Sequence, residues 1–209
     1  MRTRLSALAL ACLLGAPAIA RAQPGSPEET AAKQENASVA AFRYRVAIAG
    51  LLQLKPGMVA AEVGAVSGFV ARAMASQVGP HGRVIASTLQ PGMVVYMGRR
   101  AESEGLGNFS VVLGQPAATG LEPASIDAAV VVNAFSAFAR QADMLRSIAA
   151  SLKPGGALLI VDLPREKVGS AEVGIDADDV VTLATAAGFK REAESSVVPG
   201  QYAIRFRKP

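Results

Sequence analysis

The sequence predicts an α/β protein: a three-layer sandwich with helices on both faces of a mostly parallel, seven-stranded sheet that ends in an antiparallel C-terminal hairpin. Three observations predict this class. Short apolar segments alternate with segments of helical periodicity along most of the chain. The segment 126–132 is almost entirely apolar, as a strand covered on both faces of a parallel sheet should be. The last two apolar segments are separated by Pro199 and Gly200, which predicts a hairpin.

The N-terminal residues 1–22 are predicted to be a secretory signal peptide. A short basic start precedes an apolar run over 5–20, and Ala20-Arg-Ala22 offers a cleavage site of the A-x-A type. The run is too short for a typical membrane span, although an uncleaved anchor is the alternative. We therefore expect an exported protein, periplasmic or secreted, without a stable membrane span after signal cleavage.

Cleavage would change the composition of the chain. It removes the only cysteine, Cys12, and three arginines, which leaves 18 basic against 17 acidic residues. Disulfides and cysteine–zinc sites are thereby excluded, and the near-neutral charge gives no indication of nucleic acid or of a membrane surface as partner. The polar residues 23–37 are predicted to be a disordered leader, and 38–209 to be a single domain.

Proline and glycine residues mark the boundaries of the elements in this domain. The first helix stops at Pro56 and Gly57, the third begins at Pro91, where a missing N–H costs nothing, and the last ends at Gly188. The final strand alternates apolar and polar residues, which predicts one buried face. Helices are expected over 39–54, 69–78, 91–104, 138–152 and 176–187, and strands over 59–63, 84–88, 111–113, 126–132, 157–161, 189–198 and 201–207.

The segment Glu62-Val-Gly-Ala-Val-Ser-Gly68 carries the strongest functional signal. An apolar strand ends in an acid, a glycine follows, and a second glycine opens a helix, which is the layout of a nucleotide-binding strand–loop–helix turn. Val66 stands where such loops commonly have another glycine.

Further segments appear in a fixed order around this turn: Leu54-Lys-Pro-Gly-Met58, Val78-Gly-Pro-His-Gly-Arg-Val84, Gln90-Pro91, Leu113-Gly114, Ile126-Asp127, Val132-Asn133, Leu152-Lys-Pro-Gly-Gly156 and Ala187-Gly-Phe189. In this order the chain resembles the class I S-adenosylmethionine-dependent methyltransferases, and more closely an exported subgroup, over about 39–207. The resemblance implies a Rossmann-like fold with S-adenosylmethionine lying across the carboxyl ends of the first strands.

The resemblance implies a cofactor contact at each of these strand ends. Glu62 corresponds to the acid near the methionine part of the cofactor, and Gly64 and Gly68 to the glycines that let the backbone approach. Val66 departs from the pattern, because a β-branched side chain restricts the backbone and would point toward the methionine arm. Thr88 replaces the acid that usually holds both ribose hydroxyls, and a hydroxyl offers a weaker contact without charge.

The third and fourth strands complete the implied set. Gln115 follows Gly114 where the family often has an aspartate that accepts from the adenine amino group, and Asn133 directly follows the fourth strand. Similar exported sequences tend to have histidines near Ser136 and Ala137, where this chain has no titratable group. The resemblance therefore implies a member of the family with a degenerate cofactor site.

Candidates for catalysis are few. His81 lies in a turn remote from the cofactor edge, and Asp162, after the fifth strand, could cap the turn at Pro164 or take part in chemistry. The acids at 176, 178 and 179 suit the first turn of a helix better than a metal site. No catalytic residue and no metal ligand are therefore assigned.

Two functions remain open at the level of sequence. The first is an exported S-adenosylmethionine-dependent methyltransferase acting on a small molecule or an envelope component. The second is a catalytically inactive protein of the same fold that binds a small-molecule ligand or an envelope partner through the same cleft. A Rossmann-type oxidoreductase is disfavoured, because Thr88 also lacks the acid that a dinucleotide ribose would need.

Overall fold

The computed structural model describes residues 25–168 and 171–209, so the predicted signal peptide lies outside the described residues. One seven-stranded sheet has the order β3-β2-β1-β4-β5-β9-β8. Its strands are β1 (Val59–Val63), β2 (Arg83–Thr88), β3 (Phe109–Leu113), β4 (Ile126–Val132), β5 (Leu152–Asp162), β8 (Lys190–Ser195) and β9 (Tyr202–Arg207). The first five are mutually parallel, and β9 runs antiparallel between β5 and β8. The predicted sheet and its antiparallel end are confirmed.

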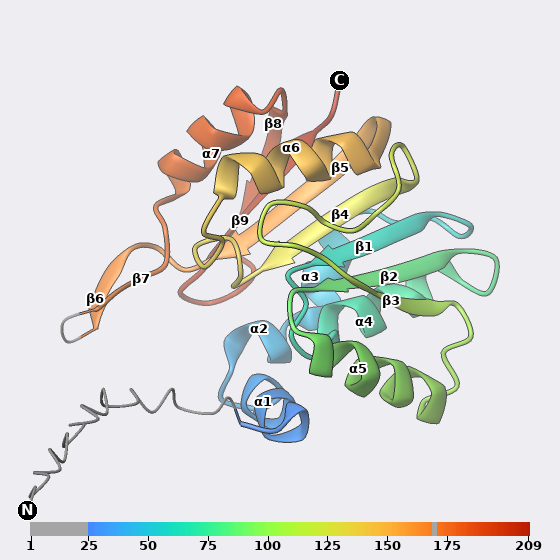
Figure 1. Ribbon diagram of the computed structural model, residues 1–209. Coiled ribbons are helices and arrows are strands. Elements are labelled where there is room, and N and C mark those ends of the chain that lie inside the picture. Colours follow the sequence, from blue (N-terminus) through green and yellow to red (C-terminus); the bar gives the residue numbers. More distant parts are fainter. Residues whose placement is uncertain (1–24, 169–170) are drawn as a thin grey trace, which may run out of the picture.

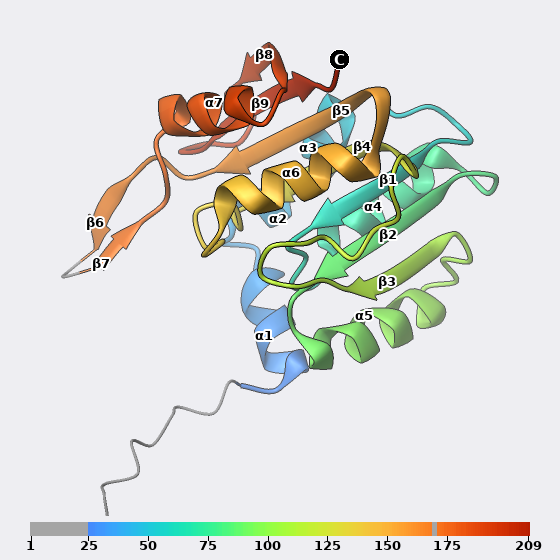
Figure 2. The same cartoon turned by 45° about the horizontal axis from the view of Figure 1, so that its top comes forward.

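Helices cover both faces of this sheet, as Figures 1 and 2 show. They are α1 (Pro27–Gln34), α2 (Ala40–Arg43), α3 (Arg45–Leu51), α4 (Phe69–Val78), α5 (Pro91–Ser103), α6 (Gln141–Ser151) and α7 (Ala177–Ala186). The helices α3, α4 and α5 pack on one face, and α6 and α7 on the other. A small hairpin of β6 (Glu166–Val168) and β7 (Ala171–Val173) projects from the body after β5.

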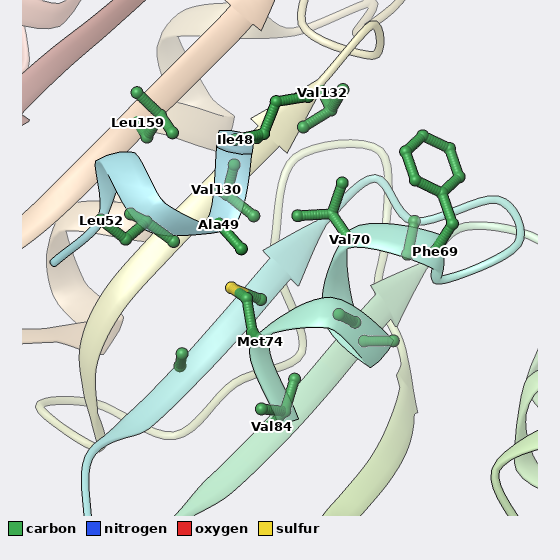
Figure 3. Packing of buried hydrophobic residues seen from close by; sticks show 14 of the residues in the cluster. Ile48, Ala49, Leu52, Phe69, Val70, Met74, Val84, Val130, Val132 and Leu159 are labelled. Atoms are coloured by element: carbon green, nitrogen blue, oxygen red, sulfur yellow. The ribbon is translucent and has the colours of Figure 1, made fainter. Parts of the chain in front are cut away.

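The alternation of side chains along each strand separates the core into two clusters. In β4, Val130 and Val132 face α3 and α4, whereas Val131 faces α6. Figure 3 shows the first cluster, in which Ile48 of α3 and Met74 of α4 meet the sheet. The second cluster is formed by the other face of the same strands with α6 and α7. Each strand thus contributes to both cores, and this explains its nearly continuous apolar sequence.

Some elements differ from the sequence-based expectation. The predicted helix 39–54 is broken at Tyr44 (φ −96°, ψ 11°) into α2 and α3. The predicted helix 138–152 begins only at Gln141, because Phe138 is buried in the preceding loop. The strand expected over 157–161 begins five residues earlier, at Leu152, and the hairpin β6–β7 was not predicted.

The prediction of a disordered leader over 23–37 is wrong at 27–34, where the structure has helix α1. Ser26 caps this helix, its Oγ accepting from the N–H of Glu29 at 3.1 Å, and Pro27 occupies the first turn. Ala31 is buried in the first cluster, and Glu35 pairs with Arg72 of α4 at 2.8 Å. The polar composition concealed the helix because only one of its residues is buried.

The crossover between β3 and β4 is a loop in place of a helix. Residues 114–125, all within the described part of the chain, form a bridge between Gln115 and Ala118 and then run back to β4. The loop is fastened to its surroundings, since the Ser87 hydroxyl of β2 donates to the carbonyl of Thr119 at 2.6 Å, and the N–H of Thr119 donates to Ser147 Oγ of α6. Across the described ranges, no helix has both the length and the apolar character to cross a membrane.

Candidate functional site

The loop between β1 and α4 is shaped by two glycines. Gly64 and Gly68 have φ angles of 80° and 70°, in the left-handed region that glycine adopts readily. A Cβ on Gly64 would lie 2.8 Å from Ala134 Cβ and 2.9 Å from the ring of Phe138. A Cβ on Gly68 would lie 2.9 Å from the sulfur of Met97. Both glycines therefore permit close packing as well as the turn itself.

The backbone of this loop is tied to β2. The N–H groups of Gly64 and Ala65 both donate to the carbonyl of Ser87, at 3.0 and 2.9 Å. The φ angle of Val66 is not positive, and its half-buried side chain packs against the first cluster. The loop thus accommodates valine without the backbone strain anticipated from the sequence, and Val66 packs toward the helices.

Glu62, at the end of β1, is buried at 4% exposure. Its Oε2 accepts a hydrogen bond from the N–H of Ala71, in the first turn of α4, at 2.7 Å. Burial raises the pKa of Glu62 to about 7, although the Ala71 N–H and the nearby Arg72 both lower it. The carboxyl group therefore caps α4, and its burial favours the protonated form.

Thr88, at the end of β2, is also buried, with 1% of its surface exposed. Its Oγ1 accepts from the N–H of Gln90 at 3.3 Å, and its carbonyl accepts from the N–H of Gly114 at 2.8 Å. The hydroxyl is therefore engaged in the turn that leads into α5. The exposed groups at this strand end are the side chains of Leu89 and Gln90.

Gln115 and Asn133 follow β3 and β4, as predicted, but their settings differ. Gln115 is exposed, and its backbone forms two hydrogen bonds with Ala118, at 2.8 and 3.0 Å. Asn133 has a φ of 49°, unusual for a residue other than glycine, and its buried Oδ1 has no hydrogen-bond partner in the part of the chain that the structure describes. The Oγ of Ser67, in the β1–α4 loop, is likewise buried and unpaired. Buried polar atoms are normally paired, so these two atoms are candidate ligand contacts.

The loop after β4 is anchored by Asp162 of β5. The N–H and the hydroxyl of Ser136 donate to the Asp162 carboxylate at 3.1 and 3.3 Å, and the N–H of Leu163 donates at 2.8 Å. Burial raises the pKa of Asp162, and these hydrogen bonds partly offset that effect. Asp162 was considered either as a cap for the turn at Pro164 or as a group in the chemistry. The geometry supports a structural role, in which Asp162 holds the backbone after β5 and also the loop that carries Asn133.

The remaining candidates lie away from these strand ends. His81 is exposed in the turn between α4 and β2, at the opposite edge of the sheet. Asp176 and Asp179 lie at the start of α7, where they pair with Arg165 at 3.3 and 2.5 Å. Within the described ranges, no group of three or more potential metal ligands is found.

A cavity of about 740 Å³ lies beside the β2–α5 turn. One wall is formed by Leu89, Gln90 and the start of α5, and the other by α1, including Thr30 and Gln34. Sequence reasoning missed the α1 wall because it treated 23–37 as disordered. The signal that could have located it was Ser26 followed by Pro27 and two glutamates, a pattern typical of a helix N-terminus.

Comparison with known proteins gives a consistent picture of the fold. Residues 60–156 match a family described as "Methyltransferase domain". A SAM-dependent methyltransferase from Aquifex aeolicus is similar with a TM-score of 0.77 at 21% identity, over 89% of this chain and 100% of that chain. A putative methyltransferase from Bacillus halodurans gives a TM-score of 0.66 at 16% identity, over 79% and 98%.

The similar structures are not all named as methyltransferases. The [4+2]-cyclase SpnF gives a TM-score of 0.68 at 18% identity, over 80% of each chain. No curated protein matches this chain. At these identities the structures establish the shared fold, and the chemistry has to be argued from the residues at the strand ends.

Proposed function

Because this chain belongs, by its fold and by its residues 60–156, to the class I methyltransferase family, we propose that it is an exported S-adenosylmethionine-dependent methyltransferase acting on a small molecule or an envelope component. The observation that carries this proposal is the pair of buried, unpaired atoms Ser67 Oγ and Asn133 Oδ1, in the loops after two adjacent strands. S-adenosylmethionine offers ammonium, carboxylate and hydroxyl groups, which fit such partners.

The backbone of this edge also supports the proposal. Gly64 and Gly68 keep the positive φ angles of the turn after β1, and Asp162 holds the loop that positions Asn133. When bound, the cofactor would supply an electrophilic methyl group. The protein would contribute orientation and exclusion of water, since residues 133–139 contain no titratable side chain.

Isothermal titration calorimetry of residues 23–209 with S-adenosylmethionine and S-adenosylhomocysteine tests this proposal. Binding in the micromolar range is the expected result. Absence of heat at millimolar ligand, with the protein shown to be folded by circular dichroism, would overturn it.

The second candidate is a protein of this fold that binds a ligand without transferring a methyl group. It is favoured by the engagement of Glu62 and Thr88 in the protein's own hydrogen bonds and by the occurrence of a cyclase on the same fold. Formation of S-adenosylhomocysteine on incubation with envelope extracts distinguishes the two. Cofactor binding without any turnover across such extracts would favour the second candidate.

Export is supported by the basic, apolar and small-residue segments within residues 1–22. Expression of the full chain in a Gram-negative host should yield a periplasmic protein whose N-terminus is Gln23. Recovery of the full-length chain from the cytoplasm alone would contradict export.

A further inference from the structure

The helix α1 lies beside the carboxyl end of β2, where the ribose of the methyl donor would be expected. In Figure 2, the arrowheads of β1, β2 and β3 point toward the side of the molecule on which α1 lies. A Cβ on Gly92, in the first turn of α5, would lie 3.2 Å from Pro27 of α1. At its other end, α1 is followed by Glu35, which pairs with Arg72 at 2.8 Å. The position of α1 is thus fixed at both ends.

Between α1 and the β2–α5 turn lies the cavity of about 740 Å³ described above. Its volume falls within the range of roughly 300–1,000 Å³ that is common for small-molecule sites. Leu89, 40% exposed, provides an apolar surface, and Thr30, Gln34 and Gln90 provide neutral donors and acceptors. Among the described residues that line the cavity, Lys33 is the one ionisable side chain, and there is no carboxylate. This composition suits a neutral ligand that combines a flat apolar ring with hydroxyl groups.

The side chain at the end of β2 is not available for the same task. Thr88 is 1% exposed, and its hydroxyl accepts from the N–H of Gln90. The two residues that follow it, Leu89 and Gln90, are exposed and line the cavity. The side chains available to a ligand at this strand end are therefore those one and two residues after Thr88, on the side of α1.

We propose that this cavity holds the nucleoside end of the methyl donor, and that Gln34 and Gln90 provide the hydrogen bonds to it that Thr88 cannot. The inference rests on the proposed function and adds to it a wall made by α1. In this arrangement the residues before the first strand take part in cofactor recognition, and Leu89 packs against the adenine ring.

Calorimetric titration of residues 23–209 with S-adenosylhomocysteine, and separately with adenosine, tests the inference. Gln34→Ala and Gln90→Ala should each weaken both ligands about threefold to tenfold, the effect of one lost neutral hydrogen bond. Gln77→Ala, near the end of α4 and remote from the cavity, is the matched control and should leave both affinities unchanged.

The possible outcomes separate the inference from the proposed function. If S-adenosylhomocysteine binds the wild type and all three variants alike, the inference is overturned and the proposed function stands. If the two variants weaken S-adenosylhomocysteine but leave adenosine unaffected, the cavity does not hold the nucleoside end and the inference is again overturned. If the wild type binds neither ligand, the proposed function fails and the inference fails with it.

Discussion

Glu62 and Asp162 are acidic side chains removed almost entirely from solvent, at 4% and 1% exposure, and both hold backbone in place. Glu62 accepts from the first turn of α4, and Asp162 accepts from the loops after β4 and β5. Burial raises the pKa of each carboxyl group. At the scale of the residue, the charged groups nearest the candidate site therefore organise loops, and neither is exposed to a ligand.

The pKa of Glu62 predicts a pH-dependent stability. The pKa of Glu62 is about 7 in the folded chain and about 4.5 for an ordinary glutamate, so between these pH values the folded state binds more protons than the unfolded state. The free energy of unfolding should therefore fall as the pH rises from 4.5 to 7. We expect a loss of about 3 kcal/mol from this group. Glu62→Gln keeps an oxygen for the Ala71 N–H and should remove this slope in urea unfolding measured across pH 4.5–7.

Glu28→Gln is the control for this experiment, because Glu28 is exposed in α1 and its replacement should leave the slope intact. Equal slopes for the wild type and Glu62→Gln would show that Glu62 does not titrate between these limits.

Asp162→Ala should destabilise the protein by about 3 kcal/mol, since the N–H groups of Ser136 and Leu163 would lose their partner. Ser136→Ala removes only the weaker hydroxyl bond, at 3.3 Å, and should cost about 1 kcal/mol or less. Denaturant unfolding at pH 7 measures both. An equal effect of the two substitutions would contradict the role assigned to the backbone bonds.

Sequence reasoning named candidate residues for the site but could not describe their states. The positions after each strand were implied by the resemblance to the methyltransferase family, in which the cofactor lies across the carboxyl ends of the first strands. The negative φ region of Val66, the buried hydroxyl of Thr88 and the unpaired oxygen of Asn133 depend on packing between segments distant in sequence. No local pattern records such contacts.

At the scale of the element, α1 is held by a narrow apolar contact and by charges. Ala31 is 1% exposed, whereas the neighbouring Ala32 is exposed. Glu35 pairs with Arg72 at 2.8 Å and with Arg100 at 3.8 Å. A helix of eight residues is too short to be stable alone, so its order depends on these contacts.

Ala31→Asp should release α1, because it places an unpaired charge in the first cluster. We expect hydrogen exchange of the amides in 27–35 to accelerate about tenfold or more, while the amides of the sheet remain protected. Ala32→Asp makes the same chemical change one residue away, on the exposed side, and should leave the exchange nearly unchanged. Similar exchange in both variants would show that α1 is not packed as described.

Element boundaries were predictable where glycine and proline mark them and less so elsewhere. Helix α4 begins after Gly68 and ends before Gly79, as expected. The break at Tyr44 lacks such a marker, whereas β5 runs back through Pro154, Gly155 and Gly156 to Leu152, so that here the markers lie inside the strand. Helix α1 was missed for the opposite reason, since its capping residues were present but its composition was polar.

At the scale of the whole molecule, the two clusters share one sheet, and this predicts one cooperative unfolding transition. Met74→Ala in the first cluster and Phe206→Ala in the second each leave a cavity at a fully buried site and should cost about 3 kcal/mol or more. Far-ultraviolet and near-ultraviolet circular dichroism should report the same shifted midpoint for each variant.

Val46→Ala, at a site 63% exposed, serves as the control and should change stability by less than about 0.5 kcal/mol. Two separate transitions in either core variant would show that the layers unfold independently.

The fold class was predictable at this scale because alternating elements leave few arrangements that bury every apolar face. No element was predicted over 114–125, and what the sequence could not show is how this loop is attached to its surroundings. The loop is held in place by hydrogen bonds of the Ser87 and Ser147 hydroxyls with the backbone of Thr119. These three residues come from three separate segments of the chain.

The place of β9 in the sheet has a consequence for the order of events during synthesis. Its residues, 202–207, come after every other strand in the chain, yet they pair with β5 on one side and β8 on the other. Until the ribosome has released this segment, the edge of β5 opposite β4 has no partner strand, and β8 has no strand through which to join the sheet. From the completion of β5 until this segment is released, a nascent chain therefore displays an open strand edge to chaperones, and native assembly must await the residues of β9.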